Sequence, residues 1–334
     1  MKTVGFGDFL IHFSPIGDER FAQSEYMQMS FTGAEANVCA ALSYWGEQTK
    51  FVTRLPEHAL AKKGVSFLRS FGIDTENISY GDGRMGVYYL ENGRFLRSSS
   101  VIYDRDGSVF TASGYDDYDW DAIFNDADVF YVSGITPALS ESLFETVKRA
   151  MAEAKSRSIR VFFDINYRPK LATPIEYYDI IKELLPYISY LIGNEEHLKM
   201  IFGISSEYGE NEPERRLSDI IAKVREKTEI EHIAVTVRRT ISASEALVYA
   251  AFSSGKDFAI SPQIRTGVVD RVGSGDAFSA GLIYATVNGY CIDKAIRFAS
   301  ASGALKHTVT KDINFASVEE IQDIMNQAVN DVRR

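Results

Sequence analysis

The stretch with the clearest chemical potential is VVDRVGSGDAF, residues 268–278, which places glycines and a carboxylate at the start of an apolar helical pattern. Glycines ahead of a helix let the backbone approach a ligand, and the free amides there bind anions with the help of the helix dipole. We therefore expect a phosphate on Gly273, Ser274 and Gly275. Asp276 stands at the same turn, although its carboxylate repels an anion.

Phosphoryl transfer to an alcohol needs both features in one place. The transferring oxygens require hydrogen-bond donors, and the incoming hydroxyl requires a base. On this interpretation Asp276 is the catalytic base, and Gly273, Ser274 and Gly275 stabilise the transferred charge. The alternative is that Asp276 only caps the helix and the glycines only shape a turn. The stretch is neither a phosphate loop ending in Gly-Lys-Ser/Thr nor a dinucleotide fingerprint, which belongs in the first βα unit.

Alternating strands and helices must position this turn. Four β-branched or aromatic runs are predicted as strands, at 128–134, 160–166, 189–194 and 232–237. Apolar residues at helical spacing predict helices at 141–156, 175–185, 214–228, 277–288, 292–307 and 317–332. This alternation indicates βαβ units, and therefore an α/β fold with a mainly parallel central sheet covered by helices on both faces.

Polar side chains stand at the ends of the predicted strands. They include Asp164, Asn166, Asn194 and Thr236. Because ligands bind at the carboxyl ends of the strands in open parallel sheets, these side chains mark one edge of the expected site.

Residues 84–113 follow a different pattern. VYYL at 87–90 and FLRSSSVI at 95–102 flank the turn sequence ENGR, which predicts an antiparallel hairpin. A small β-sheet that projects from the main body and covers the site is the expected role of this segment. Its exposed edge could pair with a second copy of the chain, so a homo-oligomer formed through the lid is one hypothesis.

Composition narrows the class of protein. In the 334 residues, 36 Lys and Arg against 46 Asp and Glu give a net charge of -10, which disfavours nucleic acid and anionic membranes as partners. The apolar runs are shorter than the ~20 residues that cross a bilayer, and the first meets Asp8 too early for a secretory signal. We therefore expect a cytoplasmic enzyme. Cys39 and Cys291 are expected to be buried thiols.

Motifs near both ends of the chain resemble those of the ribokinase-like, or pfkB, carbohydrate kinases. The C-terminal signature of that family has Asp, two residues, Gly-Ala/Ser-Gly-Asp and then a helix, which Asp270 and residues 273–276 match. The N-terminal signature is a Gly-rich entry to a helix that carries an Asn, and TGAEANVCAALSYWG matches it with Gly33 and Asn37. The resemblance covers nearly the whole chain.

The resemblance implies one kinase domain over residues 1–334, with a three-layer fold and a β lid formed by segments near 10–33 and 84–113. Within the family the chain is most similar to the kinases of 2-keto-3-deoxygluconate, on stretches such as VIYDRDGS, DINYRPKL and IGNEE. It therefore implies ATP- and Mg²⁺-dependent phosphorylation of the primary hydroxyl of a ketodeoxy sugar acid, giving the 6-phosphate.

The resemblance also implies which residues bind the sugar acid. They are Asp8, Gly33, Ala34, Asn37, Tyr89, Tyr103, Arg105, Arg168 and Asp276. The chemistry of the acceptor agrees, because a guanidinium grips a carboxylate through paired hydrogen bonds that a neutral sugar does not need. Surface ion pairs for the two arginines, and lid packing for the two tyrosines, are the alternatives.

ATP is implied to lie across the later strand ends and the last helices, on Asn166, Asn194, Thr236, Arg238, Gly273, Gly275 and Ser302. Small residues in ASASGALKH, 299–307, leave room for adenine or simply pack the helix. The family's Asn-x-x-Glu magnesium motif ends here in His197, so Glu195 and Glu196 are the candidates to hold the metal through water. Arg238 stands where many relatives have a glycine-bearing turn, and it either binds phosphate or caps the loop.

Three other functions remain open from the residues. One is a kinase of a neutral sugar or nucleoside on the same fold, and another is a sugar-acid binding protein without activity. The third and most distant is a nicotinamide dehydrogenase. The intact Asp276 favours a kinase over the binding protein.

Overall fold

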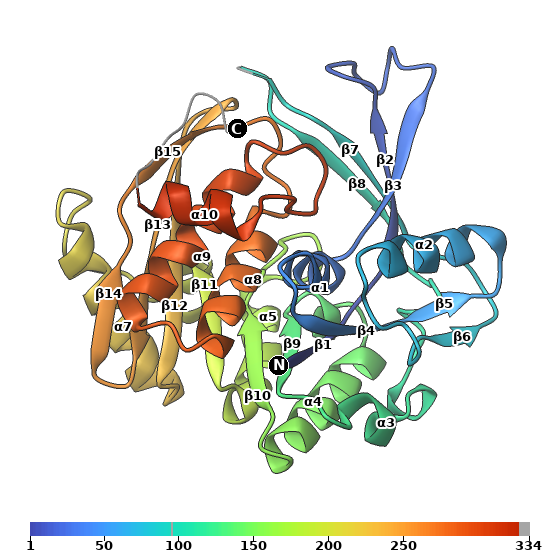
Figure 1. The fold of residues 1–334 in the computed structure, drawn as a ribbon, viewed down its shortest axis with the longest axis horizontal. Helices are drawn as coiled ribbons and strands as arrows, with labels where there is room; N and C mark the ends of the chain where they lie inside the picture. The colour runs from blue at the N-terminus through green and yellow to red at the C-terminus, as the bar shows by residue number, and fades with distance from the viewer. Residues whose placement is uncertain (95, 327–334) are drawn as a thin grey trace.

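A nine-stranded mixed sheet forms the centre of the computed structural model, which describes residues 1–94 and 96–326 (Figure 1). Its strands are β1 (Lys2–Phe6), β4 (Gln48–Val52), β9 (Val129–Ser133), β10 (Arg160–Asp164), β11 (Tyr190–Asn194), β12 (His232–Ser242), β13 (Glu245–Ser254), β14 (Asp257–Ile260) and β15 (Ile264–Gly267). They follow the order β14-β13-β12-β11-β10-β9-β1-β4, with β15 paired to β13. The strands from β4 to β12 pair in parallel, and β13, β14 and β15 add an antiparallel end.

Helices cover both faces of this sheet, which confirms the predicted three-layer α/β fold (Figure 1). The helices of one face are α1 (Ala34–Tyr44), α8 (Ser274–Val287), α9 (Ile292–Lys306) and α10 (Val318–Met325). Those of the other face are α3 (Trp120–Phe124), α4 (Glu141–Ser156), α5 (Pro174–Leu184), α6 (Glu195–Phe202) and α7 (Pro213–Thr228).

Strand β9 explains why the predicted strands read as continuous apolar runs. All five of its residues are buried. Successive side chains of a strand point to opposite faces, so Phe130 and Val132 join the core beneath α4, while Val129 and Tyr131 join the core beneath α8. A strand that is buried on both faces cannot alternate between apolar and polar residues.

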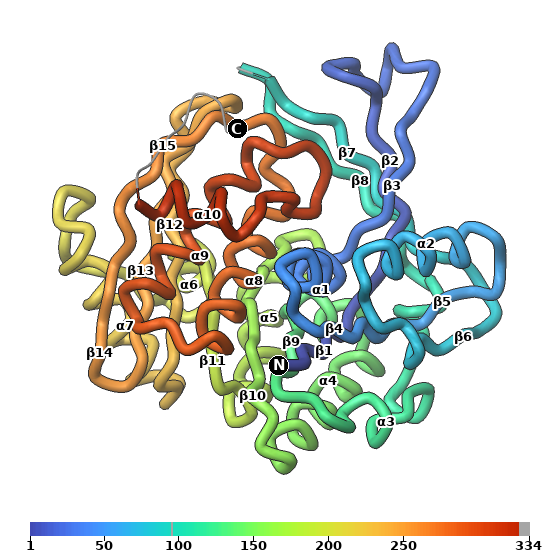
Figure 2. Tube along the Cα trace, viewed as in Figure 1, coloured from blue at the N-terminus to red at the C-terminus, as the bar shows by residue number. Residues whose placement is uncertain are grey.

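A second, four-stranded sheet projects to one side of the main sheet (Figure 2). Its strands are β2 (Leu10–Pro15), β3 (Met27–Thr32), β7 (Val87–Glu91) and β8 (Ser100–Asp104), in the order β3-β2-β7-β8. These strands come from the two segments predicted to form a lid. Beside it lie α2 (Ala59–Ser70) and a two-stranded sheet of β5 (Arg54–Pro56) and β6 (Ser79–Gly81).

The hairpin in this second sheet has a longer tip than the sequence predicts. Its second strand begins at Ser100 instead of residue 95. A tight turn precedes it, because the N–H of Arg97 donates to the carbonyl of Arg94 at 2.8 Å, and the Arg97 guanidinium donates to the carbonyl of Asn92 at 3.1 Å. These contacts hold the chain out of the ladder until Ser100.

Strand β12 and Cys291 also differ from the sequence prediction. Strand β12 continues to Ser242 instead of ending at 237, since it forms a hairpin with β13. Helix α10 is described only to Met325, and the predicted residues 327–332 lie outside the described part of the chain. Cys39 is buried as predicted, but Cys291 is exposed because it caps the N-terminus of α9 instead of lying within the helix.

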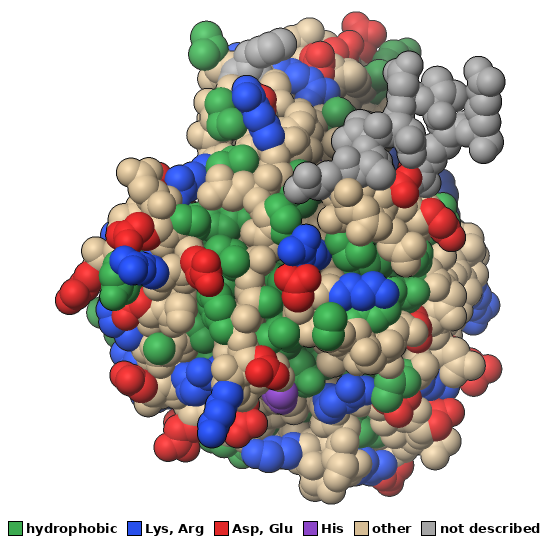
Figure 3. All heavy atoms as spheres, turned by 60° about the vertical axis from the view of Figure 1, so that its left-hand side comes forward, with side chains coloured by type: hydrophobic (Ala, Val, Ile, Leu, Met, Phe, Trp, Pro, Cys, Tyr) green, Lys and Arg blue, Asp and Glu red, His purple; other side chains and the backbone are tan. Residues whose placement is uncertain are grey.

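Acidic and basic side chains are interspersed on the face drawn in Figure 3. That face carries the antiparallel end of the main sheet and the nearby helix α7. Within residues 1–94 and 96–326, no helix has both the length and the apolar character needed to cross a membrane.

Candidate active site

A cavity of about 710 Å³ lies between the carboxyl ends of the parallel strands and the second sheet. Asp164 and Asn194 line it from the ends of β10 and β11, and Thr236 lines it from within β12 beside Asn194, whereas Tyr88 and Tyr103 line it from β7 and β8. The predicted sheet edge and the projecting sheet therefore enclose one site.

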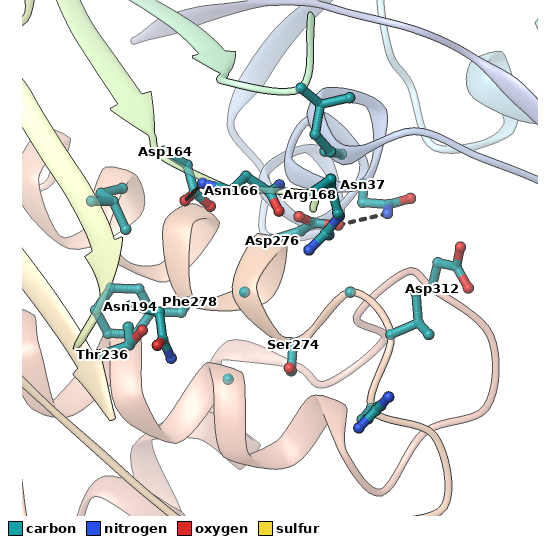
Figure 4. A pocket seen from close by; sticks show the side chains of 18 of the residues that line it. Asn37, Asp164, Asn166, Arg168, Asn194, Thr236, Ser274, Asp276, Phe278 and Asp312 are labelled. Carbon is teal, nitrogen blue, oxygen red and sulfur yellow. Dashed lines mark hydrogen bonds between the residues drawn. The ribbon is translucent and has the colours of Figure 1, made fainter. Parts of the chain in front are cut away.

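Asp276 lies in the first turn of α8 and faces this cavity (Figure 4). Its Oδ2 accepts a hydrogen bond of 2.8 Å from Nδ2 of Asn37 on α1, so the two predicted motifs meet. Burial raises the pKa of Asp276 to about 7, and the charge of Asp164 adds to that rise. Hydrogen bonding by Asn37 and the charge of Arg168 oppose it. A carboxyl group with a pKa near neutrality suits general base catalysis at physiological pH.

The two glycines of the turn serve different needs. Gly273 caps α8 with a φ of 80°, and a side chain there would collide with the carbonyl oxygen of Asp312. Gly275 is helical, and apart from its chain neighbours and the backbone of its own helix, no atom of the described chain lies within 4 Å of the position that a Cβ would take. Packing therefore requires a glycine at 273, but not at 275, where the open space belongs to the cavity.

The first turn of α8 offers amides to a ligand. Within the described chain, no backbone carbonyl accepts a hydrogen bond from the N–H groups of Gly275 and Asp276. Unsatisfied amides at a helix N-terminus, together with the helix dipole, favour an anion. The arrangement can thus bind an anion directly beside the Asp276 carboxyl group.

The end of β10 presents a buried carboxylate to the cavity. Asp164 Oδ1 accepts the N–H of Asn166 at 3.0 Å, and its Oδ2 accepts the hydroxyl of Ser279 at 3.3 Å. Burial raises the pKa of Asp164 to about 6. Asn166 has a φ of 41°, the left-handed conformation in which Asn is among the favoured residues, and this turns the chain away from the strand.

Asp8 and Arg105 form a buried ionic pair where the cavity meets the second sheet. Nη1 of Arg105 lies 3.7 Å from Oδ2 of Asp8, and the two side chains are only 5% and 6% exposed. The Arg105 guanidinium also lies 4.6 Å from the ring centroid of Tyr103. Burial raises the pKa of Asp8 to about 6, against the opposing charge of Arg105.

Arg168 lines the same cavity and lies close to the carboxyl group of Asp276 (Figure 4). No ion pair within the described chain includes its guanidinium. Its positive charge nevertheless lowers the pKa of both Asp276 and Asp164. Arg168 is therefore a cation that remains available to an anionic ligand.

Strand geometry places Tyr88, and not Tyr89, on the cavity side of the second sheet. Tyr88 pairs in register with Tyr103, and their rings stack at 5.6 Å, so both face the cavity. Tyr89 points to the other face of β7, where its ring stacks on Phe13 at 5.8 Å. The two neighbours cannot share one face, because side chains alternate along a strand.

Most residues named from the sequence line the cavity: Asp8, Gly33, Ala34, Asn37, Tyr103, Arg105, Asn166, Arg168, Asn194, Thr236, Arg238, Gly273, Ser274, Gly275 and Asp276. Tyr89, Glu195, Glu196 and Ser302 do not line it. The Glu195 carboxylate pairs with Arg216, Glu196 is exposed, and the Ser302 hydroxyl donates to the carbonyl of Ala277 at 2.8 Å, between α9 and α8.

The sequence did not single out Glu35, Asp312 and Arg271, which also line the cavity. Glu35 is buried at the start of α1 and accepts the N–H of Ser133 at 2.8 Å, and burial raises its pKa to about 7. Its place inside the motif around Asn37 was a usable signal. Asp312 and Arg271 lie outside any periodic element, so no pattern distinguished them from surface residues.

The donor set fits a magnesium ion that is carried by phosphates. No cluster of three or more His, Cys, Asp or Glu side chains in the described chain has the arrangement of a protein-bound metal centre. Asp164 and Asn194 line the cavity with oxygen donors. Magnesium bound with substrate phosphates keeps several waters and takes only one or two protein carboxylates.

Known proteins share this architecture over its whole length. A 2-dehydro-3-deoxygalactonokinase from Haloferax volcanii is 29% identical over 333 residues, covering 97% of this chain and 96% of its own. The crystal structure of a 2-dehydro-3-deoxygluconokinase from Thermotoga maritima is 34% identical with a TM-score of 0.94, covering 98% of both chains. A putative ribokinase II from E. coli, solved with ATP and Mg²⁺, has the same fold at 18% identity and a TM-score of 0.78, covering 98% of this chain and 99% of its own.

The fold is therefore ribokinase-like, as the two sequence motifs indicated. Residues 2–319 match the sequence model of the pfkB family of carbohydrate kinases. Because this match spans nearly the entire chain, the protein belongs to the pfkB family and is a carbohydrate kinase, a family of enzymes that use ATP.

Proposed function

We propose that this kinase transfers the γ-phosphoryl group of ATP to the primary hydroxyl of a ketodeoxy sugar acid, 2-keto-3-deoxygluconate or its galactonate counterpart. The arrangement around Asp276 carries the proposal, because a carboxyl group with a pKa near 7 lies beside free helix amides in the same cavity as Arg105 and Arg168. The relatives from Haloferax volcanii and Thermotoga maritima, a 2-dehydro-3-deoxygalactonokinase and a 2-dehydro-3-deoxygluconokinase, support the same class of acceptor.

The reaction follows from the residues at the centre of the cavity. The ionised carboxylate of Asp276 accepts the proton of the substrate hydroxyl as its oxygen attacks the γ-phosphorus, and the bond to the leaving oxygen of ADP breaks in line. The N–H groups of Gly275 and Asp276 stabilise charge on the transferred oxygens. Asn37 holds Oδ2 of Asp276, so the substrate proton goes to Oδ1.

Arginines at the acceptor end select a carboxylate. Arg105 is buried and partly neutralised by Asp8, and Arg168 has no carboxylate partner in the described chain. A sugar acid supplies the missing negative charge and can take paired hydrogen bonds from a guanidinium. A neutral sugar would leave the charge of Arg168 without a counterion. The unpaired guanidinium therefore favours a sugar acid over a neutral sugar as the acceptor.

The nucleotide occupies the other end of the cavity. Thr236 and Arg238 line that end from β12, and Ser300 and Gly303 line it from α9, where small side chains leave room for the base. Asp164 and Asn194 would hold magnesium through water, in place of Glu195, whose carboxylate is paired with Arg216. The ion, when bound, neutralises phosphate charge that builds up during transfer.

The second sheet is proposed as the lid. Tyr88 and Tyr103 face the cavity from its strands, and closure of these strands over the sugar would exclude water, which competes as a phosphoryl acceptor. Pairing of two copies through an edge of this sheet remains a prediction. A monomeric mass by light scattering would contradict it.

A coupled assay of ADP release tests the proposed reaction. The purified chain, with ATP and magnesium, is offered 2-keto-3-deoxygluconate, 2-keto-3-deoxygalactonate, ribose, fructose and adenosine, and Asp276→Asn serves as the inactive control. We expect turnover with the sugar acids alone. Turnover of a neutral substrate would support kinase activity but contradict a sugar acid as the acceptor. ATP consumption that survives in the variant would contradict the role of Asp276 as the base.

A further inference from the structure

Two arginines at the nucleotide end of the cavity, Arg238 and Arg271, lack a carboxylate partner. Both line the 710 Å³ cavity, and both also line a second cavity of about 300 Å³ beside it. The Nε of Arg238 is buried without a hydrogen-bond partner. Among residues 1–94 and 96–326, no ion pair includes either guanidinium. In a protein with a net charge of -10, two unpaired guanidiniums at one cavity call for an explanation.

The next residue along β12 shows that the fold can neutralise an arginine here. Arg239 points to the other face of the strand, where its Nη1 lies 2.9 Å from a carboxylate oxygen of Glu210. Its Nη2 also donates to the hydroxyl of Tyr249 at 3.2 Å. Arg238, one residue earlier, receives neither kind of partner. The difference lies in the side of the strand that each side chain faces, and only Arg238 faces the cavity.

Acidic groups near the pair are engaged elsewhere. The carboxylate of Asp270, the residue before Arg271, accepts the N–H of Val272 at 3.0 Å and the N–H of Lys311 at 3.1 Å. The charge of Glu196 favours the ionised form of Arg238, but Glu196 is exposed and forms no ion pair with it in the described chain. The two guanidiniums are close enough that the charge of Arg271 lowers the pKa of Arg238, after the larger effect of burial.

The pair also adjoins the amides that can bind an anion. Arg271 lies two residues before Gly273, the cap of α8, and all three of Arg238, Arg271 and Gly273 line the same cavity. An anion on the amides of the helix turn therefore has guanidiniums beside it. Asp276, in the first turn of the same helix, lines this cavity as well.

We infer that Arg238 and Arg271 bind the phosphate chain of the nucleotide as a pair, and that the nucleotide supplies the negative charge that both guanidiniums lack. This inference rests on the proposed function, since it takes the anion to be ATP or ADP. Guanidinium groups suit the role because their planar donors match phosphate oxygens in pairs. The sugar acid is left to the arginines at the other end of the cavity.

Calorimetric titration of the full chain with ADP and with adenosine, without any sugar, tests whether Arg238 and Arg271 bind the nucleotide phosphates. The variants are Arg238→Met and Arg271→Met, and Arg239→Met is the matched control because its guanidinium is paired with Glu210. Losing charged hydrogen bonds to phosphate should weaken ADP binding about 10-fold in each variant. Adenosine has no phosphates, so its affinity should not change, and the control should bind ADP normally.

Several results would overturn the inference. An ADP affinity that falls no further in Arg271→Met than in Arg239→Met would do so, as would an equal loss of adenosine affinity. Arg238→Lys and Arg271→Lys keep a charge at each site and should recover part of the ADP affinity if a variant with Met folds poorly. A wild-type chain that binds neither nucleotide would reject the proposed function as well. Normal sugar-acid turnover with unchanged ADP binding would reject this inference alone.

Discussion

The two ends of the cavity are built in opposite ways. At the acceptor end Asp8 is paired with Arg105 and Asp276 is hydrogen-bonded to Asn37, and these four side chains are buried, whereas Arg168 is partly buried and has no ion pair in the described chain. At the nucleotide end Arg238 is only partly buried, Arg271 is exposed, and neither has a carboxylate partner in the described chain. The acceptor end is thus mostly organised before substrate arrives and leaves only the charge of Arg168 to the sugar acid, whereas both arginines of the nucleotide end obtain their counter-charge from the ligand.

This contrast has a consequence for specificity. Burial makes an unmatched polar group costly, so a site of buried, paired groups discriminates strongly between acceptors. The exposed guanidinium of Arg271 is hydrated when the site is empty, so it can bind phosphate without demanding one fixed geometry. The largest effects of substitution are therefore expected at the acceptor end.

Asp276→Asn should cause the largest loss of activity among the substitutions at the acceptor end. Removing the base is expected to lower kcat by about 10³-fold, in the range for general base catalysis, while the amide keeps its contact with Asn37. The same change should stabilise the fold at pH 8 by on the order of 2 kcal/mol, because a buried charge is removed. Thermal unfolding and the ADP-release assay measure the two effects. Asp179→Asn, at an exposed helix position, is the control.

A fall in kcat together with a fall in stability would contradict this prediction, since it would show that Asp276 has a structural role. An unchanged kcat would show that Asp276 is not the catalytic base. The opposite directions of the two effects separate catalysis from damage to the fold.

Arg168→Met should weaken the acceptor end without unfolding it. Its guanidinium has no ion pair in the described chain, so its removal breaks none, although Asp276 and Asp164 lose a nearby positive charge. The loss of a charged contact with the sugar acid predicts a rise in KM for the acid of about 10-fold to 100-fold, with the KM for ATP changed little. Steady-state kinetics with each substrate varied in turn give both constants.

Arg105→Met gives a sharper version of the same comparison. It should raise the KM for the acid and also lower stability, because Asp8 is left buried without its partner. The double variant Asp8→Asn/Arg105→Met should recover stability but not the KM. Equal effects on the KM for ATP would contradict the division between the two ends.

The pH dependence should report the buried carboxyl of Asp276. With a pKa raised to about 7, kcat/KM should fall about tenfold for each pH unit below that value, because the protonated acid cannot accept the substrate proton. Asn37→Leu removes a donor that favours the charged form and should therefore move the profile to higher pH. A profile that keeps its position in the variant would show that another group, such as Glu35 or Asp164, controls it.

Stability should change with pH in the opposite sense. Between the ordinary aspartate pKa of 3.8 and the folded-state pKa of about 7, the Asp276 carboxyl binds more proton in the folded state than in the unfolded state. The free energy of unfolding should therefore decrease as the pH rises through this window and then level off. In Asp276→Asn this part of the decrease should disappear, which denaturant titrations at several pH values can measure.

The periodicity of apolar residues was enough to predict the layers of the fold. Predicting which residues line the cavity also required the register between paired strands. Helix α4 has the predicted bounds, because its apolar residues recur at helical spacing. Tyr88, and not Tyr89, lines the cavity with Tyr103, because β7 and β8 pair in the register that sets Tyr88 opposite Tyr103. That pairing depends on a hairpin whose tip is longer than its turn sequence indicated, so it could not be read from the residues.

The sequence also did not indicate contacts between side chains that are far apart along the chain. Glu195 follows a strand end and is a reasonable metal ligand by motif, but Arg216 on the next helix takes its carboxylate. Asp312 enters the site from the loop after α9, where its backbone lies against Gly273. Such contacts arise from how helices pack on the sheet, and no local spacing encodes them. The motifs around Asn37 and Asp276 were strong because ligand chemistry constrains the residue types within each one.

Gly275→Ala should test the nucleotide end with the smallest change to the chain. The helix has room for a Cβ at this position, and replacing a helical glycine should stabilise the fold by about 0.5–1 kcal/mol. The same methyl group would project into the cavity beside the free amides, so the KM for ATP should rise about 10-fold while the KM for the sugar acid changes less. Gly209→Ala, also in open space but away from the cavity, is the control. If Gly275→Ala raised stability and left the KM for ATP unchanged, no phosphate would approach the backbone there, and the arginines would have to hold the nucleotide without the helix amides.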